Sequence, residues 1–389
     1  MAVGTHYPAE RRTYRDLQTG RQVTQLTDSP AEDYHPYFYN PAVTPDGRYL
    51  IFFSERSGLS NLFRLQLTSG KIVQLTDARP VHAEYWPFTE AVRGAGACLA
   101  AIGSGGQEVF YFEGRELWAV EIESLRARRL LTLPADRRPS ILHANADGTT
   151  LVFATWDEAL FLEGSRRAYA GEYFDVDDPF YHATTSTILR VDAATGRAED
   201  LLRHEKFWIN HVLINPYNPD LILFCHEYTR APDRMWLLNA ATGHFAPLQG
   251  QSTDEWYQHE FWSPDGQRIC FHGGSENDET HGFFGWCSLD GTQYHKFHHY
   301  TPGRAYAHYN LHPDRRTMVT DGEAHPGCIS KVQLIDERQV YEVLCRHDSY
   351  RFGDDQRCHP HPSFTPDGQQ VIFTSNQSGT SNVYMTDWT

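Results

Sequence analysis

The chain has 389 residues, of which 40% are hydrophobic and 13% aromatic, and its formal net charge is -16. This apolar content can fill a sizeable core, which excludes a disordered chain, and the negative balance disfavours nucleic acid as a partner because phosphate binding needs a basic face. The seven cysteines form no CxxC pair and no run approaches the roughly 18 apolar residues of a membrane span. We therefore expect a cytoplasmic protein with no membrane segment and no disulfide framework.

The first predicted strand is RQVTQLT at residues 21–27, which nearly repeats KIVQLT at 71–76 although it precedes the first turn. From residue 44 onward, a turn followed by a β-rich run recurs along the chain: TPDGRYLIF (44–52), NADGTTLVF (145–153), NPDLILF (218–224), SPDGQRICF (263–271), HPDRRTMVT (312–320) and TPDGQQVIF (365–373). Proline presets φ and glycine accepts positive φ in such turns, so each marks the start of a hairpin.

The spacing of these turns predicts the fold class. The gaps between successive turn aspartates are 101, 73, 45, 49 and 53 residues. A degenerate copy at 92–102 divides the first gap, and a polar and aromatic insertion near 162–185 lengthens the second. Units of about 50 residues with short strands are typical of propeller blades. We predict an all-β, seven-bladed β-propeller, formed by residues 1–389 as a single domain, with the N-terminal strand closing the last blade. Several β-sandwich domains would fit this uniform period less well.

Histidines recur at one register of these units. Six residues before the turn aspartate stand His259, His308 and His361, and His359 lies two residues before His361, on the same face of an extended strand. The first strand of each blade lines the central channel, so we expect these imidazoles to converge there. Gln356 is a nearby oxygen donor. Single histidines are more often packed than ligating, but this register favours a metal or catalytic site, and nitrogen donors with an oxygen suit Mn, Fe, Ni or Zn.

At these residues the sequence resembles the oligogalacturonate lyases, seven-bladed propellers that degrade short pectin fragments in the bacterial cytoplasm. The resemblance spans essentially the whole chain and is carried by GRQVTQLT, YFY at 37–39, FCHE at 224–227, DRMWLLN at 233–239, HEFWSPDG at 259–266 and QRCHPHPSFTPDG at 356–368. It implies a metal ion, normally manganese, held by His308, Gln356, His359 and His361. It also implies His259 as the catalytic base and Arg234 as a charge-neutralising residue. Pairing of Arg234 with an acidic neighbour is the structural alternative.

The implied reaction is β-elimination on short oligogalacturonides, an acidic oligosaccharide substrate, giving 4,5-unsaturated products. Register and aromatic character add the candidate substrate contacts His211, His226, Tyr37 and Tyr85, for which packing is an equally good explanation. The segment after His308 looks shorter than the family's loop, which leaves the exact sugar and chain length open. Glucuronan or ulvan fragments are alternative substrates, and a non-catalytic protein-binding scaffold is the alternative from another class. No G-x-S-x-G, H-E-x-x-H or G-x-G-x-x-G motif supports a different enzyme.

Overall fold

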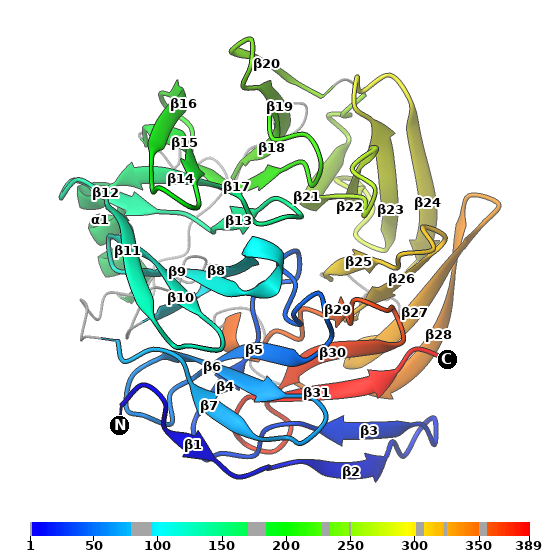
Figure 1. The fold of residues 1–389 in the computed structure, drawn as a ribbon. Helices are drawn as coiled ribbons and strands as arrows, with labels where there is room; N and C mark the ends of the chain where they lie inside the picture. The colour runs from blue at the N-terminus through cyan, green and yellow to red at the C-terminus, as the bar shows by residue number, and fades with distance from the viewer. Residues whose placement is uncertain are drawn as a thin grey trace.

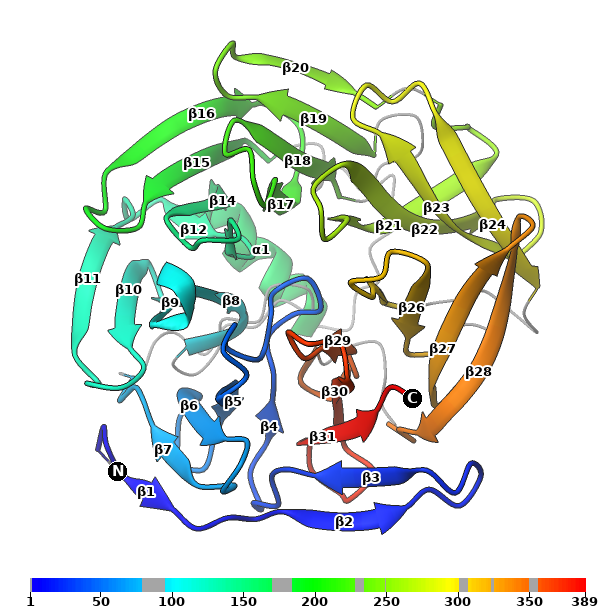
Figure 2. The same ribbon diagram turned by 45° about the vertical axis from the view of Figure 1, so that its right-hand side comes forward.

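The computed structural model describes residues 2–78, 95–169, 184–227, 234–248, 250–300, 307–322, 325–349 and 356–389. Within these ranges almost every element is a strand, and the sheets follow one another in chain order around a common centre (Figure 1 and Figure 2). No helix among them is long and apolar enough to cross a membrane.

The first half of the ring contains four separate sheets, and their strands are named in spatial order. The first is β1 (His6–Tyr7), β7 (Ile72–Gln74), β6 (Asn61–Gln66), β5 (Tyr49–Ser54) and β4 (Asp33–Tyr34). The second is β11 (Ala127–Thr132), β10 (Glu116–Glu121), β9 (Glu108–Glu113) and β8 (Ala95–Gly103). The third is β12 (Arg137–Pro139), β14 (Thr150–Asp157), β15 (Ser186–Asp192) and β16 (Ala198–His204), with β13 (His143–Ala144) also paired to β14. The fourth is β17 (Ile209–Ile214), β18 (Leu221–His226), β19 (Met235–Asn239) and β20 (His244–Pro247).

The second half holds an eight-stranded sheet and the closing sheet. The eight strands are β21 (Glu255–Trp262), β22 (Arg268–Ser275), β23 (His281–Ser288), β24 (Tyr294–Tyr300), β28 (Arg338–Arg346), β27 (Cys328–Ile335), β26 (Thr317–Thr320) and β25 (Tyr309–Leu311). A parallel pair, His298 with Arg338, joins β24 to β28, so this sheet is two four-stranded blades in contact at their outer strands. The closing sheet is β2 (Arg12–Arg15), β3 (Gln22–Gln25), β31 (Asn382–Asp387), β30 (Gln370–Ser375) and β29 (Ser363–Phe364). The described residues thus form seven blades, which confirms the predicted propeller.

The recurring turns are held by their aspartates. In the first, Asp46 Oδ1 accepts hydrogen bonds from the Thr44 hydroxyl at 2.6 Å and the Arg48 amide at 3.0 Å, and Gly47 adopts φ of +70°. A side chain with a Cβ is strained at that φ, which explains the glycine. The turns at 263–268 and 365–370 repeat this arrangement. Because the turn chemistry is local, it sets the start of each blade independently of its neighbours.

The N-terminal segment closes the ring. β3 pairs with β31 in antiparallel register, Val23 opposite Thr386, and the Leu26 amide donates to the Val383 carbonyl at 2.7 Å. Val23 and Leu26 are fully buried, so the closure is also apolar. The predicted closure of the last blade by the N-terminal strand is therefore confirmed. The sequence did not predict that β1 would add to β7 of the first blade, so that the N-terminal segment borders both blades at the seam.

The predicted insertion near 162–185 begins in an α-helix. α1 (Glu158–Tyr169) follows β14 directly, and its first residue, Glu158, forms an ion pair with Arg138 at 2.7 Å. The rest of the insertion, 170–183, lies outside the described residues. Two further short elements are the 3-10 turns η1 (Ser104–Gly106) and η2 (Gln356–Cys358). The second of these leads directly into the histidine pair at 359 and 361.

Candidate metal centre and catalytic histidines

Three histidines from neighbouring blades converge near the ring centre. One nitrogen from each of His308, His359 and His361 lies within 4.8 Å of the others, and all three side chains are buried. The His308 and His361 ring centroids are 4.3 Å apart, and the His359 ring is 5.7 and 5.4 Å from them. The buried Nε2 of His361 has no hydrogen-bond partner among the described residues. Such a set of converging imidazole nitrogens fits a divalent transition metal.

The fourth predicted ligand, Gln356, stands at the start of η2, two residues before Cys358, but its side chain lies outside the described residues. Tyr85, a predicted substrate contact, also lies outside them. Both remain predictions.

A buried carboxylate orients two of the three histidines. Asp321, which follows β26, accepts hydrogen bonds from the His308 amide at 2.6 Å and from His308 Nδ1 at 2.8 Å. The His361 amide lies 3.3 Å from the same carboxylate. Burial alone would raise the pKa of Asp321, but the His308 imidazole and the His308 hydrogen bonds hold it below the ordinary value. With Nδ1 of His308 held in this way, Nε2 is the nitrogen that can face a metal, and carboxylate–histidine pairs of this kind fix ligand orientation.

His259 lies directly beside the three-histidine cluster. Its ring centroid is 4.3 Å from that of His308, and its Nδ1 lies 2.8 Å from the Ala307 carbonyl oxygen and 2.7 Å from His272 Nε2. A carbonyl oxygen only accepts, so Nδ1 carries the hydrogen and Nε2 is the basic nitrogen. Burial lowers the pKa of His259 well below its ordinary value, and His308, His272 and His211 lower it further. The lowered pKa keeps this imidazole in its neutral form, with Nε2 unprotonated.

Two of the histidines in this region, His259 and His211, stand where the strand register shifts. The register between β21 and β22 shifts between Gln258 and Phe261, and that between β17 and β18 shifts between Ile209 and Val212. His259 adopts φ of +50° within the first shift. Bulges of this type redirect side chains beside functional sites, and a positive φ in a non-glycine residue is strained. His361 has φ of +44°, so strain accompanies one of the candidate metal ligands as well.

Arg234 lies in a buried ion-pair network. Its guanidinium pairs with Glu227 and, at 3.3 Å, with Glu260 on β21 of the next blade, and its exposed fraction is 5%. Glu260 also accepts a hydrogen bond from His211 Nδ1 at 2.9 Å. Burial alone would raise the pKa of Glu260, but Arg234 and His211 hold it below the ordinary value, so the carboxylate stays ionised. Arg234 therefore has the acidic partners that the alternative interpretation expected, one of them in a neighbouring blade.

Of the predicted substrate contacts, Tyr37 and His211 lie at the cluster. The Tyr37 ring is 4.7 Å from that of His361, and its hydroxyl is 3.4 Å from His211 Nε2. His226 instead stacks on Phe207 at 4.0 Å and also contacts Trp236. These contacts show that the His226 ring packs among aromatic side chains, and its role as a substrate contact stays a prediction.

Sequence reasoning assigned no role to Asp321, Glu260 or His272. Each stands beside a predicted histidine in the hairpin register or in the chain. Because Tyr309 pairs with Thr320, His308 lies opposite Asp321 across the β25–β26 hairpin. The turn at 312–316 joins the two strands of this hairpin. The position opposite His308 across that turn is Asp321, so the pairing register could have identified it.

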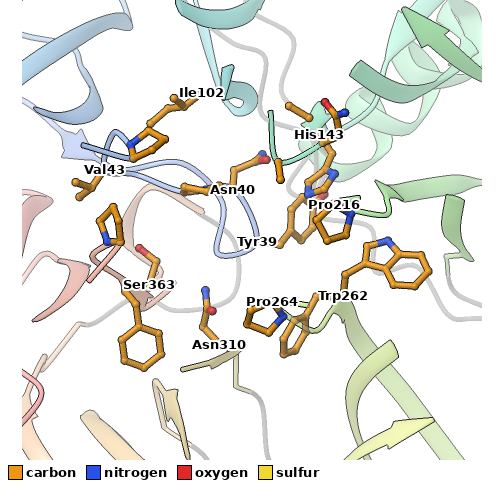
Figure 3. Close-up of a pocket in the computed structure, with 18 of the residues that line it drawn as sticks. Tyr39, Asn40, Val43, Ile102, His143, Pro216, Trp262, Pro264, Asn310 and Ser363 are labelled. Carbon is orange, nitrogen blue, oxygen red and sulfur yellow. The ribbon is translucent and has the colours of Figure 1, made fainter. Parts of the chain in front are cut away.

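A pocket of about 370 Å³ lies at the other end of the innermost strands, where the turns are. Figure 3 shows Tyr39, Pro216, Trp262 and Pro264 among the side chains around it. Its lining is mainly apolar, and it contains none of the three metal-site histidines. This pocket therefore lies on the turn side of the innermost strands and is separate from the histidine cluster.

Comparison with known proteins gives a consistent result. A family model described as oligogalacturonate lyase matches residues 1–389. The oligogalacturonide lyase of Pectobacterium atrosepticum is 24% identical over 99% of this chain and 98% of its own, and the oligogalacturonate lyase of Dickeya dadantii shows the same identity and coverage. A solved oligogalacturonate lyase in complex with manganese superposes with a TM-score of 0.83, at 26% identity, over 100% of this chain and 98% of that one.

Proposed function

The chain belongs to the oligogalacturonate lyase family, and from this premise we propose that it cleaves short oligogalacturonides by metal-assisted β-elimination to 4,5-unsaturated uronides. The observation that carries the proposal is the convergence of three buried histidines beside a fourth, neutral one, His259. A protein-binding scaffold would have no use for such an arrangement.

We propose that His308, His359, His361 and Gln356 hold a manganese ion, with other divalent transition metals as alternatives. Bound there, the ion would act as a Lewis acid on the substrate carboxylate and so stabilise the charge that develops during proton abstraction. Asp321 serves this set by fixing the orientation of His308 and the backbone at His361. The match to a manganese-containing lyase supports the choice of ion.

His259 is the proposed base. The hydrogen on C5 of a uronide lies next to the carboxylate and is weakly acidic, so it can be removed once the carboxylate is stabilised. His259 Nε2 would accept this proton, while the Ala307 carbonyl holds Nδ1–H and thereby the tautomer. The His259 ring lies next to that of His308, so the proposed base would be adjacent to a proposed metal ligand.

Arg234 is the proposed source of fixed positive charge. The net charge of -16 means that an acidic sugar needs local positive groups in order to bind. To bind the substrate carboxylate directly, the Arg234 guanidinium would release Glu227 and pair with the substrate instead. Glu260 would keep the guanidinium in position. A planar guanidinium is suited to such bidentate binding.

We also infer a single propeller domain acting in the cytoplasm without a nucleic-acid or membrane partner. The cysteines at 225, 270, 287, 328, 345 and 358 are free thiols, which supports a reducing compartment. The acidic net charge supports the absence of nucleic acid as a partner.

The test is incubation with digalacturonate and Mn²⁺ while the ultraviolet absorbance of the unsaturated product is followed, with glucuronan and ulvan fragments in parallel. We expect product from digalacturonate. His259→Ala should abolish turnover and keep the metal content, whereas His361→Ala should lose both. Absence of product from every uronide would refute the lyase, and equal metal loss in the two variants would show that the roles are assigned wrongly.

A further inference from the structure

We propose that His35, in the first blade, is a positioning residue that holds the backbone of the proposed metal ligand His361 in the last blade; this inference rests on the proposed function and its metal centre. His35 follows β4, the innermost strand of its sheet, and its exposed fraction is 3%. β4 lies beside β30 and β31 of the closing sheet (Figure 2). The first blade therefore borders, across the seam of the ring, the blade that carries His361.

The segment that needs holding is residues 359–362. It lies between η2 and β29 and belongs to neither a helix nor a strand. Two of its four residues are prolines, which have no amide hydrogen to donate. His361 adopts φ of +44°, a strained value for a residue with a Cβ, and such a conformation persists only where neighbouring groups determine it. Contacts from outside the segment must therefore fix where the His361 imidazole lies.

His35 supplies one of these contacts. Its Nε2 lies 2.9 Å from the His361 carbonyl oxygen. Because a carbonyl oxygen only accepts, Nε2 carries the hydrogen and donates it. On the other side of the residue, the His361 amide lies 3.3 Å from Asp321 Oδ2, which is at the long end of hydrogen bonding. The shorter hydrogen bond from His35 is therefore the firmer of the two contacts on the His361 backbone.

Thr374, on β30, orients His35 in turn. Its hydroxyl oxygen lies 2.8 Å from His35 Nδ1 and accepts the His35 amide at 3.3 Å. A neutral imidazole with its hydrogen on Nε2 accepts at Nδ1, so the hydroxyl donates there and fixes the ring. The Thr374 amide also donates to the Pro360 carbonyl at 3.0 Å. Thr374 thus holds the ligand segment both directly and through His35.

The same stretch of the first blade also bounds the His361 side chain. The Tyr37 ring meets the His361 ring edge-on, with centroids 4.7 Å apart and an interplanar angle of 72°. His361 Nε2 has no hydrogen-bond partner within the described ranges, and one nitrogen of this ring lies within 4.8 Å of those of His308 and His359. Because the imidazole turns with its Cα, a shift of the His361 backbone would move this nitrogen. The hydrogen bond from His35 therefore acts on the position of a ligand atom.

A second contact crosses the same seam but is weaker. Arg357 Nη1 donates to Glu55 Oε1 at 2.7 Å, and Glu55 follows β5, which pairs with β4. The two side chains are 33% and 24% exposed, so solvent screens their attraction. The buried hydrogen bond from His35 is therefore the contact whose loss should matter most to the metal site.

The test compares manganese affinity among variants of the full chain, with free Mn²⁺ followed by its electron paramagnetic resonance signal. His35→Phe keeps a ring but removes the donor, and it should weaken binding about 10- to 100-fold, as loss of a hydrogen-bond partner behind a ligand does. His35→Gln keeps a nitrogen donor for the carbonyl and should bind within about 5-fold of the wild type. Thr374→Val removes the hydroxyl that orients the ring and should weaken binding about 2- to 10-fold.

His312→Phe is the matched control for loss of a histidine that links two blades. His312 Nε2 donates to the Gly368 carbonyl at 3.1 Å, and its Nδ1 accepts from the Asp314 amide at 3.1 Å. Its ring packs on Phe364 and Trp388 at the turn that follows β25. Both phenylalanine variants should lower the free energy of unfolding of the metal-free protein in urea titrations, but only His35→Phe should lose manganese affinity.

Wild-type affinity in a folded His35→Phe protein, or in Thr374→Val should that variant not fold, would overturn the proposal. An equal loss of affinity in His35→Gln or in His312→Phe would overturn it as well, because the effect would then not follow the donor to His361. The proposed function is judged separately, from product formation by the wild type. A wild type that binds manganese but releases no unsaturated uronide would overturn that function, while the affinities would still decide the role of His35.

Discussion

Asp321→Asn tests the carboxylate that holds two of the candidate metal ligands, His308 and His361. Its two oxygens accept from the His308 amide, His308 Nδ1 and the His361 amide at 2.6, 2.8 and 3.3 Å. An amide has one acceptor oxygen, so in either orientation at least one of these N–H groups would face an NH₂ group. Leaving a buried donor unsatisfied costs about 1–3 kcal/mol. Loss of such a partner typically lowers metal affinity about 10- to 100-fold, which corresponds to about 1.4–2.7 kcal/mol.

The assay is titration with Mn²⁺, with free ion followed by its electron paramagnetic resonance signal. Asp290→Asn is the matched control, because Asp290 sits in an exposed turn and bonds its near neighbours Ser288 and Thr292. It should bind manganese like the wild type. Far-ultraviolet circular dichroism of both variants without metal shows whether the fold is retained. Wild-type affinity in a folded Asp321→Asn protein would refute the reasoning.

Three further predictions concern stability. Leu26→Ala, at the ring closure, should lower the free energy of unfolding by about 2–5 kcal/mol in urea titrations, whereas Leu17→Ala, at a fully exposed position, should change it little; equal effects would contradict an apolar closure. Burial lowers the pKa of His143 to about 3, so below pH 6.5 the unfolded chain binds a proton that the folded chain does not, and stability falls as pH falls. His143→Asn should therefore remove about 2 kcal/mol of the difference in stability between pH 8 and pH 5, and an unchanged pH slope would exclude this. Tyr37→Phe removes one hydroxyl and keeps the ring, so it should cost about 0.5–1.5 kcal/mol in thermal unfolding, while Phe38→Ala, which removes a buried ring beside His259 and His308, should cost about 3–5 kcal/mol; the reverse order would show that the hydroxyl matters more than the ring packing.

The fold was predictable because its signals are local and repeated. Each Asp-capped turn, such as that at Asp46, is decided by four or five consecutive residues, and the spacing of these turns gives the number of blades. The closing strand was predictable because residues 21–27 copy a strand of the first blade. α1 was not predicted, because a single helix inside an insertion has no repeat to mark it.

The site was predictable where register decides it. His308, His359 and His361 converge because equivalent positions of a ring face the same axis. Register does not show which neighbours a side chain packs against, such as the stacking of His226 on Phe207. It also does not report pairings between blades, such as that of Arg234 with Glu260, which depend on how two sheets lie against each other.

The pairing of β3 with β31 also constrains biosynthesis. β3 is synthesised before the intervening blades and its partner β31 after them, so this pairing can form only when the whole of that intervening chain has been made. His359 and His361 emerge shortly before β31. Ring closure and completion of the candidate metal site therefore fall within the same short interval of synthesis.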